Sequence, residues 1–497
     1  MEHNRYILNP DYVYKNDIKR ILLYSTNKPS EYSAKSWFSM IHPVQAMLLS
    51  FFSKGGSLAD IIQRISHFFA IDPSEISCMI KPFIENETPL KSIFQGNRFF
   101  FPQNVIIRET YSTQRLNFSP EDMVCPNGRD FTTKRLYSAP LHITLMLTNK
   151  CVTRCKYCYA DTETIPEKLL STEEIFQLID EAYQKGLRNF NLIGGEVFLH
   201  KDWPIILEKL VKCDFMPDIL STKIPVTEKI INHIKDTGYT KNIQISLDAL
   251  SSPILENSLC VNTYYMEKMR NGIRLLDESG LNYQIATILT QYNDRPEIMS
   301  ELFSFIKTLK NIKSWRIAPA TNSLYKNYFD FIKIKTNRTR VENLYTFIKR
   351  EIIPYADFPV LLDRSYIDRD FHKATKGSAS FKGAGCSALN SHLFILPDGK
   401  VTICEQLYWN PHFIIGNIRE NSLSEIWNSP KALMLAHMKR EHIQTKSKCH
   451  PCRQFQDCYE RRNRCWTDVI KAYGDTNWDY PDPRCSKAPE MIYNISF

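Results

Sequence analysis

Cysteine is the residue type whose placement in this chain could do chemistry, and three of the fourteen cysteines crowd one short segment. Cys151, Cys155 and Cys158 are spaced CxxxCxxC, and the aromatic Tyr157 precedes the third of them. Three thiolates on one loop can hold three corners of a [4Fe–4S] cube, which leaves the fourth iron without a protein ligand. An iron with an open position can chelate a substrate, as an open zinc site does. The spacing therefore predicts a cluster that binds a small molecule.

A structural zinc site is the alternative for the same three thiols. Zinc in such sites takes four protein ligands in a closed tetrahedron. No His or Cys close to this segment in the sequence supplies a fourth ligand. We therefore expect iron and sulfide, rather than zinc, at residues 151–158.

This cysteine pattern, placed directly after a strand, resembles the radical S-adenosylmethionine (radical SAM) superfamily. There the open iron binds the amino and carboxylate groups of the cofactor's methionine moiety. An electron from the cluster then cleaves the sulfonium and releases a 5′-deoxyadenosyl radical. The resemblance implies an oxidoreductase that uses S-adenosylmethionine and a [4Fe–4S] cluster with an open iron. It also implies an electron donor such as flavodoxin or ferredoxin.

Further residues at later strand ends match the same superfamily. Gly194-Gly195-Glu196 follows the second strand, and Ser246-Leu247-Asp248 resembles the SxD segment of the fourth. Glycine lets the backbone approach a ligand closely, and a carboxylate accepts hydrogen bonds from the methionine amine. The resemblance assigns cofactor contacts to these residues: Tyr157, Gly194, Gly195, Glu196, Ser221, Ser246 and Asp248.

Three positions depart from the family pattern. Val197 stands where the family usually has Pro, which leaves the preceding acid intact. Residues 221–223 read Ser-Thr-Lys, where the family often has Thr-Asn-Gly. The usual Arg-Gly segment after the fourth strand is not visible near Cys260, so the ligand of the cofactor carboxylate has no assignment from the sequence.

A second group of seven cysteines lies near the C-terminal end: Cys386, Cys404, Cys449, Cys452, Cys458, Cys465 and Cys485. This pattern resembles the SPASM domain that is attached to many radical SAM enzymes, although six residues separate Cys458 from Cys465 where the family usually has three. The resemblance implies two auxiliary [4Fe–4S] clusters. It assigns the first of them to Cys449, Cys452, Cys458 and Cys485. It assigns the second, with an iron left open, to Cys386, Cys404 and Cys465. A pair of zinc sites that also use His442 or His450 is the alternative.

Glu405 directly follows one of these cysteines. In the related sulfatase-maturing enzymes the matching position is an acid that takes a proton from the substrate, so the resemblance implies a catalytic role for Glu405. An auxiliary iron–sulfur centre can accept the second electron that bond formation releases. A solvated acid in a turn is the alternative reading of Glu405.

Alternating strands and helices must position these groups. The apolar strand segments are 141–148, 189–193, 218–222, 242–248, 283–290 and 313–319. The clearest helix starts at Ser171, where Glu174 completes a capping box, and stops at Gly186. This order predicts an α/β fold, a partial (β/α)6 TIM-like barrel over 141–320, with its active groups at the carboxyl ends of the strands.

Hydrophobic periodicity and cysteine content divide the rest of the chain into four further segments. Residues 1–103 show two strand-like runs, at 6–8 and 21–24, then three short helices and a hairpin, which predicts a winged helix-turn-helix domain. We expect a linker over 104–140, a helical connector over 321–380 and a Cys-rich iron–sulfur domain over 381–497.

Two functions compete for the winged helix-turn-helix, and a purely structural cap on the barrel is a third. A DNA reader needs several basic contacts to phosphate, and the third helix, residues 74–83, carries one Lys and one Glu. The region resembles the leader-binding recognition element of peptide-modifying enzymes. We therefore expect an exposed sheet edge in the early hairpin to accept a leader peptide as an added strand.

Together these interpretations predict a radical SAM peptide maturase. The precursor peptide is bound through its leader, a hydrogen atom is abstracted, and a crosslink forms, with a thioether as first choice and a carbon–carbon bond as second. The alternatives are a sulfatase-type maturase acting on Cys or Ser of a protein partner and a DNA-binding iron–sulfur sensor. The formal net charge of +9 is mild for this length, and the N-terminus lacks a signal-peptide pattern. We expect a cytoplasmic enzyme that binds neither nucleic acid nor membrane.

Overall fold

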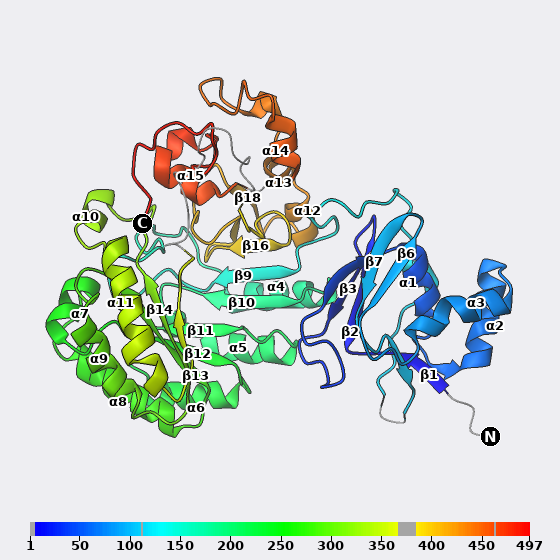
Figure 1. Cartoon of the computed structure of the whole chain (residues 1–497), viewed down its shortest axis with the longest axis horizontal. Helices are drawn as coiled ribbons and strands as arrows, with labels where there is room; N and C mark the ends of the chain where they lie inside the picture. Colours follow the sequence, from blue (N-terminus) through cyan, green and yellow to red (C-terminus); the bar gives the residue numbers. More distant parts are fainter. Residues whose placement is uncertain (1–4, 111–112, 366–383, 462–463) are drawn as a thin grey trace. The chain divides into compact units, whose positions relative to one another are not determined.

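A computed structural model of the chain describes residues 5–110, 113–365, 384–461 and 464–497. Two compact units make up the chain, Met1–Ala139 and Pro140–Phe497. Figure 1 draws both units with their helices and strands. Each unit has its own sheets and is described by itself below.

The first unit contains three small antiparallel sheets and three helices. The first sheet has the order β5-β1-β8, from Gly56–Ser57, Arg5–Leu8 and Ile106–Arg108. The second has the order β2-β3-β4, from Tyr12–Asn16, Ile21–Ser25 and Phe38–Ile41. The third is the hairpin of β6 (Leu90–Phe94) and β7 (Asn97–Phe101). The two strand-like runs expected from the sequence are therefore strands of two different sheets, and they do not form one hairpin.

The three helices of this unit begin where the sequence places their caps. They are α1 (Pro43–Ser50), α2 (Leu58–Phe69) and α3 (Pro73–Ile80). The Ser57 side chain accepts the N–H of Asp60, and the Asp72 side chain accepts the N–H of Ser74. These bonds satisfy donors that a helix start leaves unpaired.

Residues 104–139 belong to the first unit, although a linker was expected there. They supply β8 and a short 3-10 helix at Pro120–Met123. The N–H groups of Tyr137 and Ser138 both bond to Oδ1 of the buried Asp17, at 2.8 Å. Such contacts over more than a hundred residues of sequence are invisible to local periodicity.

The second unit contains the six expected parallel strands. They are β9 (His142–Met146), β10 (Asn189–Ile193), β11 (Ile219–Thr222), β12 (Asn242–Ser246), β13 (Tyr283–Leu289) and β14 (Ile312–Pro319). The intervening helices are α4 (Thr172–Gln184), α5 (Trp203–Lys212), α6 (Glu228–Asp236), α7 (Ser252–Leu259), α8 (Tyr265–Glu278) and α9 (Pro296–Ile306). Figure 1 shows α6 to α9 on the outer side of β11 to β14. The α/β fold is confirmed, and the predicted capping box between Ser171 and Glu174 starts α4.

The strand ladder differs from a single six-stranded sheet in two ways. One sheet has the order β11-β12-β13-β14-β15, where β15 (Val360–Leu362) is a seventh parallel strand. The other has the order β10-β9-β16-β17-β18, in which β9 pairs with β16 (His392–Ile395). Its remaining strands are β17 (Lys400–Thr402) and β18 (Ile414–Asn417). The first barrel strand therefore joins the C-terminal region directly to the barrel.

Short elements fill the remainder of this unit. The expected connector, 321–380, contains α10 (Tyr328–Ile332), α11 (Arg338–Glu351) and β15, and its residues 366–380 lie outside the described residues. The C-terminal helices are α12 (Leu423–Trp427), α13 (Pro430–Ala436), α14 (Phe455–Arg461) and α15 (Trp466–Tyr473). In the part of the chain that the structure describes, none of the helices has the length and apolar character of a membrane span.

Candidate active site at the strand ends

The loop after β9 directs its cysteines inward. Along 152–157 the residues alternate between exposed and buried, so that Thr153, Cys155 and Tyr157 are buried. The N–H groups of Arg154 and Lys156 bond to the carbonyl oxygens of residues 259 and 258, at 2.9 and 3.0 Å. These bonds fix the loop against the end of α7, so the protein backbone holds the thiols in place.

The thiols of this loop lie close enough to change one another's pKa values. The Thr153 hydroxyl lies 3.1 Å from the sulfur of Cys155 and 3.5 Å from that of Cys151. Burial raises the pKa of Cys155 to about 11, and the neighbouring Cys158 adds to this shift. Burial and the charge of Cys151 raise the pKa of Cys158. Buried thiolates of this kind need a cation beside them, and iron bound at the sulfurs would supply it.

The glycine pair after β10 allows a close backbone contact. A Cβ on Gly195 would lie 2.4 Å from the carbonyl oxygen of Lys150, and one on Gly194 would lie 3.0 Å from that of Thr148. The N–H groups of Gly195 and Glu196 bond to these two segments, at 2.8 Å each. Glycine is therefore required here to join the ends of β9 and β10, whatever its role toward a cofactor.

Glu196 is held between the ends of β10 and β11. Its carboxylate accepts bonds from the Thr222 hydroxyl at 2.8 Å and from the Lys223 N–H at 3.0 Å. The residue is only 2% exposed, and burial raises its pKa. Within the described residues Glu196 has no ion pair, so a cationic ligand would stabilise its ionised form.

The side chains of Tyr157, Asp248 and Lys223 form one hydrogen-bonded cluster. The Tyr157 hydroxyl donates to Asp248, and Lys223 Nζ donates to the Tyr157 oxygen at 2.9 Å and to Asp248 Oδ2 at 3.1 Å. Burial alone would lower the pKa of Lys223, yet Asp248 and Cys155 raise it above its ordinary value. The sequence reasoning did not place Lys223 in the site, although the departure from Thr-Asn-Gly was the signal that pointed to it.

Ser221 and Ser246 lie at the ends of β11 and β12. Ser221 Oγ accepts a hydrogen bond from Gln244 Nε2 at 3.1 Å, and Gln244 Oε1 accepts one from Gln284 Nε2 at 2.9 Å. This places Ser221 in a row of polar side chains across β11 to β13. Ser246 is the last residue of β12 and is half-buried.

Electrostatic interactions link Cys404 to Cys386 and Cys465, and link Cys449 to Cys452 and Cys485. Burial raises the pKa of Cys404 to about 12, with further contributions from Glu405 and Cys386, and Cys404 in turn helps to raise the pKa of Cys465. In the other set, burial, Cys485 and Cys452 raise the pKa of Cys449.

Cations lie beside the sulfurs of Cys449 and Cys452. Arg464 and Lys487 donate to the sulfurs of Cys449 and Cys452, at 3.5 and 3.3 Å. Cys458 is half-buried in α14. The charge of Arg464 acts against burial and lowers the pKa of Cys449, which favours the thiolate, the form that binds iron.

Two observations bear on the nature of these sites. Across the described residues, no three His, Cys, Asp or Glu side chains form a preformed site for a single metal ion. Glu405 is half-buried, burial raises its pKa, and within the described ranges its carboxylate has no hydrogen-bond partner.

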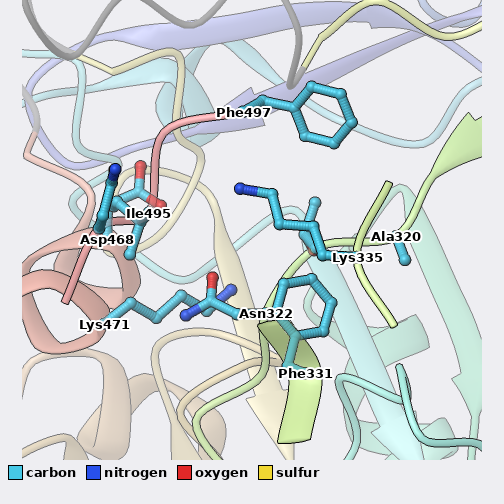
Figure 2. A pocket seen from close by; sticks show the side chains of 10 residues that line it. Ala320, Asn322, Phe331, Lys335, Asp468, Lys471, Ile495 and Phe497 are labelled. Atoms are coloured by element: carbon cyan, nitrogen blue, oxygen red, sulfur yellow. The ribbon is translucent and has the colours of Figure 1, made fainter. Parts of the chain in front are cut away.

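A small pocket lies between the residues that follow β14 and helix α15. Figure 2 shows Lys335 and Phe331 on one side of it, and Asp468 and Lys471 of α15 on the other. Lys471 Nζ bonds to the side chain of Gln406 at 2.9 Å. The pocket therefore adjoins the segment that carries Cys404 and Glu405, on the side that faces the carboxyl end of β14.

Comparison with known proteins identifies the two parts that hold the thiols. Residues 145–306 match the radical SAM superfamily, and residues 386–459 match the SPASM iron–sulfur cluster-binding domain. A GTP 3′,8-cyclase of Campylobacter curvus is 25% identical over 232 residues, which are 45% of this chain and 70% of that protein. A PqqA peptide cyclase of Granulibacter bethesdensis is 22% identical over 352 residues, which are 70% of this chain and 88% of that protein.

A solved structure extends the likeness over nearly the whole chain. Streptococcus suis SuiB bound to precursor peptide SuiA superposes with a TM-score of 0.62 at 16% identity, covering 97% of this chain and 99% of that one. At this identity the superposition establishes a shared fold. The chain therefore contains a radical SAM domain, which binds S-adenosylmethionine and a [4Fe–4S] cluster, followed by a SPASM domain that binds auxiliary iron–sulfur clusters.

Proposed function

We propose that this enzyme is a maturase of a ribosomally made precursor peptide. The observation that carries the proposal is an open strand edge in the first unit, in a chain that also has the radical SAM and SPASM domains. The shared fold with a peptide-bound SuiB and the PqqA peptide cyclase relative support the same substrate class. A maturase of folded proteins has no need of a separate unit that captures a leader.

This edge belongs to β4, which lies close to β7 but has no backbone ladder to it. In the β3–β4 ladder, Ser25 N–H bonds to the Trp37 carbonyl and Leu23 is paired with Ser39, so the groups of these residues point inward. Successive residues of an antiparallel strand alternate in direction. The N–H and C=O of Phe38 and Met40 therefore point outward, and within the described residues they have no backbone partner. A leader peptide would add here as a strand.

In this proposal the 151–158 thiols hold the first cluster, and the site residues receive the cofactor. Glu196 would accept hydrogen bonds from the cofactor's ammonium group, because it is buried and has no ion pair among the described residues. Tyr157 and Asp248 orient the thiol loop through their hydrogen bond, with Lys223 as the third member. The bound cofactor and cluster supply the 5′-deoxyadenosyl radical. In the second domain, the two thiol sets hold the auxiliary clusters, and Glu405 takes a proton from the substrate.

The product is a crosslink, with a thioether as first choice and a carbon–carbon bond as second. One hydrogen atom leaves with the deoxyadenosyl group. A second hydrogen would leave as a proton, and an auxiliary cluster held by the C-terminal thiols would accept its electron. The peptide must therefore lose the mass of two hydrogen atoms for each crosslink. We place the enzyme in the cytoplasm, supplied by an electron donor such as flavodoxin or ferredoxin.

The test uses anaerobically reconstituted enzyme, reduced and supplied with S-adenosylmethionine and the small peptide encoded next to it. Mass spectrometry should show the loss of two hydrogens in the peptide and one 5′-deoxyadenosine per crosslink. An unchanged peptide mass with continued formation of 5′-deoxyadenosine would refute the proposed substrate.

Leader capture has its own test at Met40. Met40→Pro removes an outward N–H while leaving the bonds of β4 to β3 in place, because proline is tolerated on the open side of an edge strand. Met40→Ala is the matched control, since it removes the side chain and keeps the donor. We expect leader affinity to fall about tenfold or more in the proline variant alone. Equal affinity of the two variants in fluorescence titrations would rule out strand addition at β4.

A further inference from the structure

A buried lysine follows β11 at a position where the family often has glycine. Lys223 is the third residue of the segment Ser-Thr-Lys, which replaces the usual Thr-Asn-Gly. Its side chain is only 14% exposed. Burying an ammonium group costs free energy unless hydrogen-bond acceptors and an opposite charge compensate. A glycine would avoid this cost, so the charge itself is the feature to be explained.

The charge of Lys223 is held in one place. Its Nζ donates to Asp248 Oδ2 at 3.1 Å and to the Tyr157 oxygen at 2.9 Å. The Tyr265 hydroxyl donates to the Lys223 carbonyl oxygen at 2.6 Å, which fixes the backbone at this position. Burial opposes the charged form, but Asp248 and Cys155 raise the pKa of Lys223 above its ordinary value. The side chain is therefore a fixed cation at neutral pH.

This cation acts on the sulfurs of the first thiol loop. Its partner Tyr157 stands between Cys155 and Cys158 in the chain. Burial raises the pKa of Cys155, and the charge of Lys223 opposes this rise more strongly than the charge of Asp248 adds to it. Lys223 also opposes the rise in the pKa of Cys158. The ion pair therefore acts on these sulfurs as a net positive charge.

A cluster bound to these sulfurs gains one negative charge when one electron reduces it. A fixed cation in a buried site favours the reduced form, because little water or salt screens it. Local charge, hydrogen bonds and solvent exposure set the potentials of iron–sulfur clusters. We propose that Lys223 raises the reduction potential of the cluster held by the thiols of residues 151–158. One electron passes from the reductant to the cluster, and no bond is made or broken. The proposal rests on the assignment of that cluster in the proposed function.

The experiment measures the potential of this cluster in the reconstituted holoenzyme. Dithionite with redox mediators reduces the protein stepwise, and electron paramagnetic resonance follows the signal that S-adenosylmethionine alters. Lys223→Met removes the charge and keeps most of the side-chain length. We expect the equilibrium constant for reduction to fall about tenfold, which corresponds to a potential lower by about 59 mV for one electron. Lys223→Arg should recover most of this loss, because it keeps the charge.

Two further variants separate the charge from the hydrogen bonds. Asp248→Asn removes the negative partner, so the potential should rise instead of falling. Tyr157→Phe removes the hydroxyl group and leaves both charges, so the equilibrium constant for reduction should stay within about twofold of the wild type.

A matched control removes a paired lysine from the other end of the same strands. Lys241 directly precedes β12, and its Nζ lies 2.6 Å from Asp218 Oδ1, just before β11. Lys241→Met therefore deletes the same charge from an ion pair with the same partner type. It should leave the potential unchanged.

Three results would overturn the role of the charge. They are an unchanged potential in Lys223→Met, an equal fall in Tyr157→Phe, or weaker binding of S-adenosylmethionine to Lys223→Met at an unchanged potential. Where Lys223→Met loses iron, Asp248→Asn decides, and a potential that does not rise counts against the proposal. A wild-type protein without any signal that responds to S-adenosylmethionine would instead refute the cluster assignment. The two failures are therefore distinguishable.

Discussion

The two thiol regions of this chain are built in opposite ways. Cys151, Cys155 and Cys158 lie on one short loop that parallel strands and the end of α7 hold in place. The C-terminal thiols are spread from residue 386 to residue 485, among helices that are no longer than eight residues. The comparison teaches that the barrel positions its cluster, whereas in the second region the clusters must hold the fold together, as metals do in domains with small cores.

Removing a thiol of the first region should abolish chemistry and leave the fold unchanged. In Cys155→Ala we expect formation of 5′-deoxyadenosine to fall by more than about a thousandfold, because the cluster that supplies the electron loses a ligand. The Ala side chain fits the buried position, so protease resistance of the barrel should match that of the wild type. Anaerobic turnover assays and limited proteolysis measure the two effects.

Turnover near the wild-type rate in Cys155→Ala would show that the thiols of residues 151–158 do not hold the cluster that supplies the electron. Cys213→Ala is the matched control, since this half-buried cysteine at the end of α5 has no place in either thiol region. It should retain both activity and iron.

Removing a thiol of the second region should reverse that pattern. In Cys465→Ala we expect crosslinked peptide to fall about a hundredfold, because the electron from the substrate loses its acceptor. Formation of 5′-deoxyadenosine should stay within about fivefold of the wild type, uncoupled from product. Proteolysis should now cut within 386–497, because the thiols hold this region together. A variant that keeps the wild-type cleavage pattern would show that the short helices suffice without the cluster.

The acidic residues Glu405 and Asp248, one in each thiol region, differ in their hydrogen-bond partners and in their expected roles. Asp248 is fully engaged by Tyr157, Lys223 and the N–H of Ile288, whereas Glu405 has no hydrogen-bond partner in the described part of the chain. Glu405→Gln should therefore lower peptide crosslinking about a hundredfold, the usual size of a general-base effect, with iron content and formation of 5′-deoxyadenosine unchanged. Asp248→Asn should instead lower cofactor cleavage itself. If both variants affect the same step, the separate roles are wrong.

The sequence was most informative where function depends on local spacing. The CxxxCxxC loop, the capping box at Ser171 and the six parallel strands are all readable from short windows, and the structure has them. Lys223 and β15 were missed for different reasons. The lysine gains its role only through Tyr157 and Asp248, which lie far away in sequence. The strand has three residues, and it is defined by pairing with β14 rather than by its own pattern.

The joint between the two regions should respond to acid. His392 on β16 bonds to the Thr144 hydroxyl of β9 at 2.9 Å, and burial, together with the nearby His142, lowers the pKa of His392 to about 3. An unfolded His titrates near 6.5. The unfolded state therefore binds more protons below that value, so this contribution to stability is complete above pH ~6.5 and is lost as the pH falls toward 3.

We expect His392→Gln to remove this acid dependence, because a neutral amide keeps a hydrogen bond to Thr144 and does not titrate. In the wild-type holoenzyme the opening free energy of the β9–β16 pair should fall between pH 7 and pH 5 through both His392 and His142, because burial also lowers the pKa of His142 to about 4. In the variant this fall should be smaller by about 1–2 kcal/mol, which is the part that His392 contributes. Hydrogen exchange of segments 142–146 and 392–395 measures it, with the exposed His67→Gln as the control. An equal fall in wild type and variant would show that the joint opens through other groups. The barrel and the C-terminal region would then be coupled by the strand pairing alone, independently of the histidine between them.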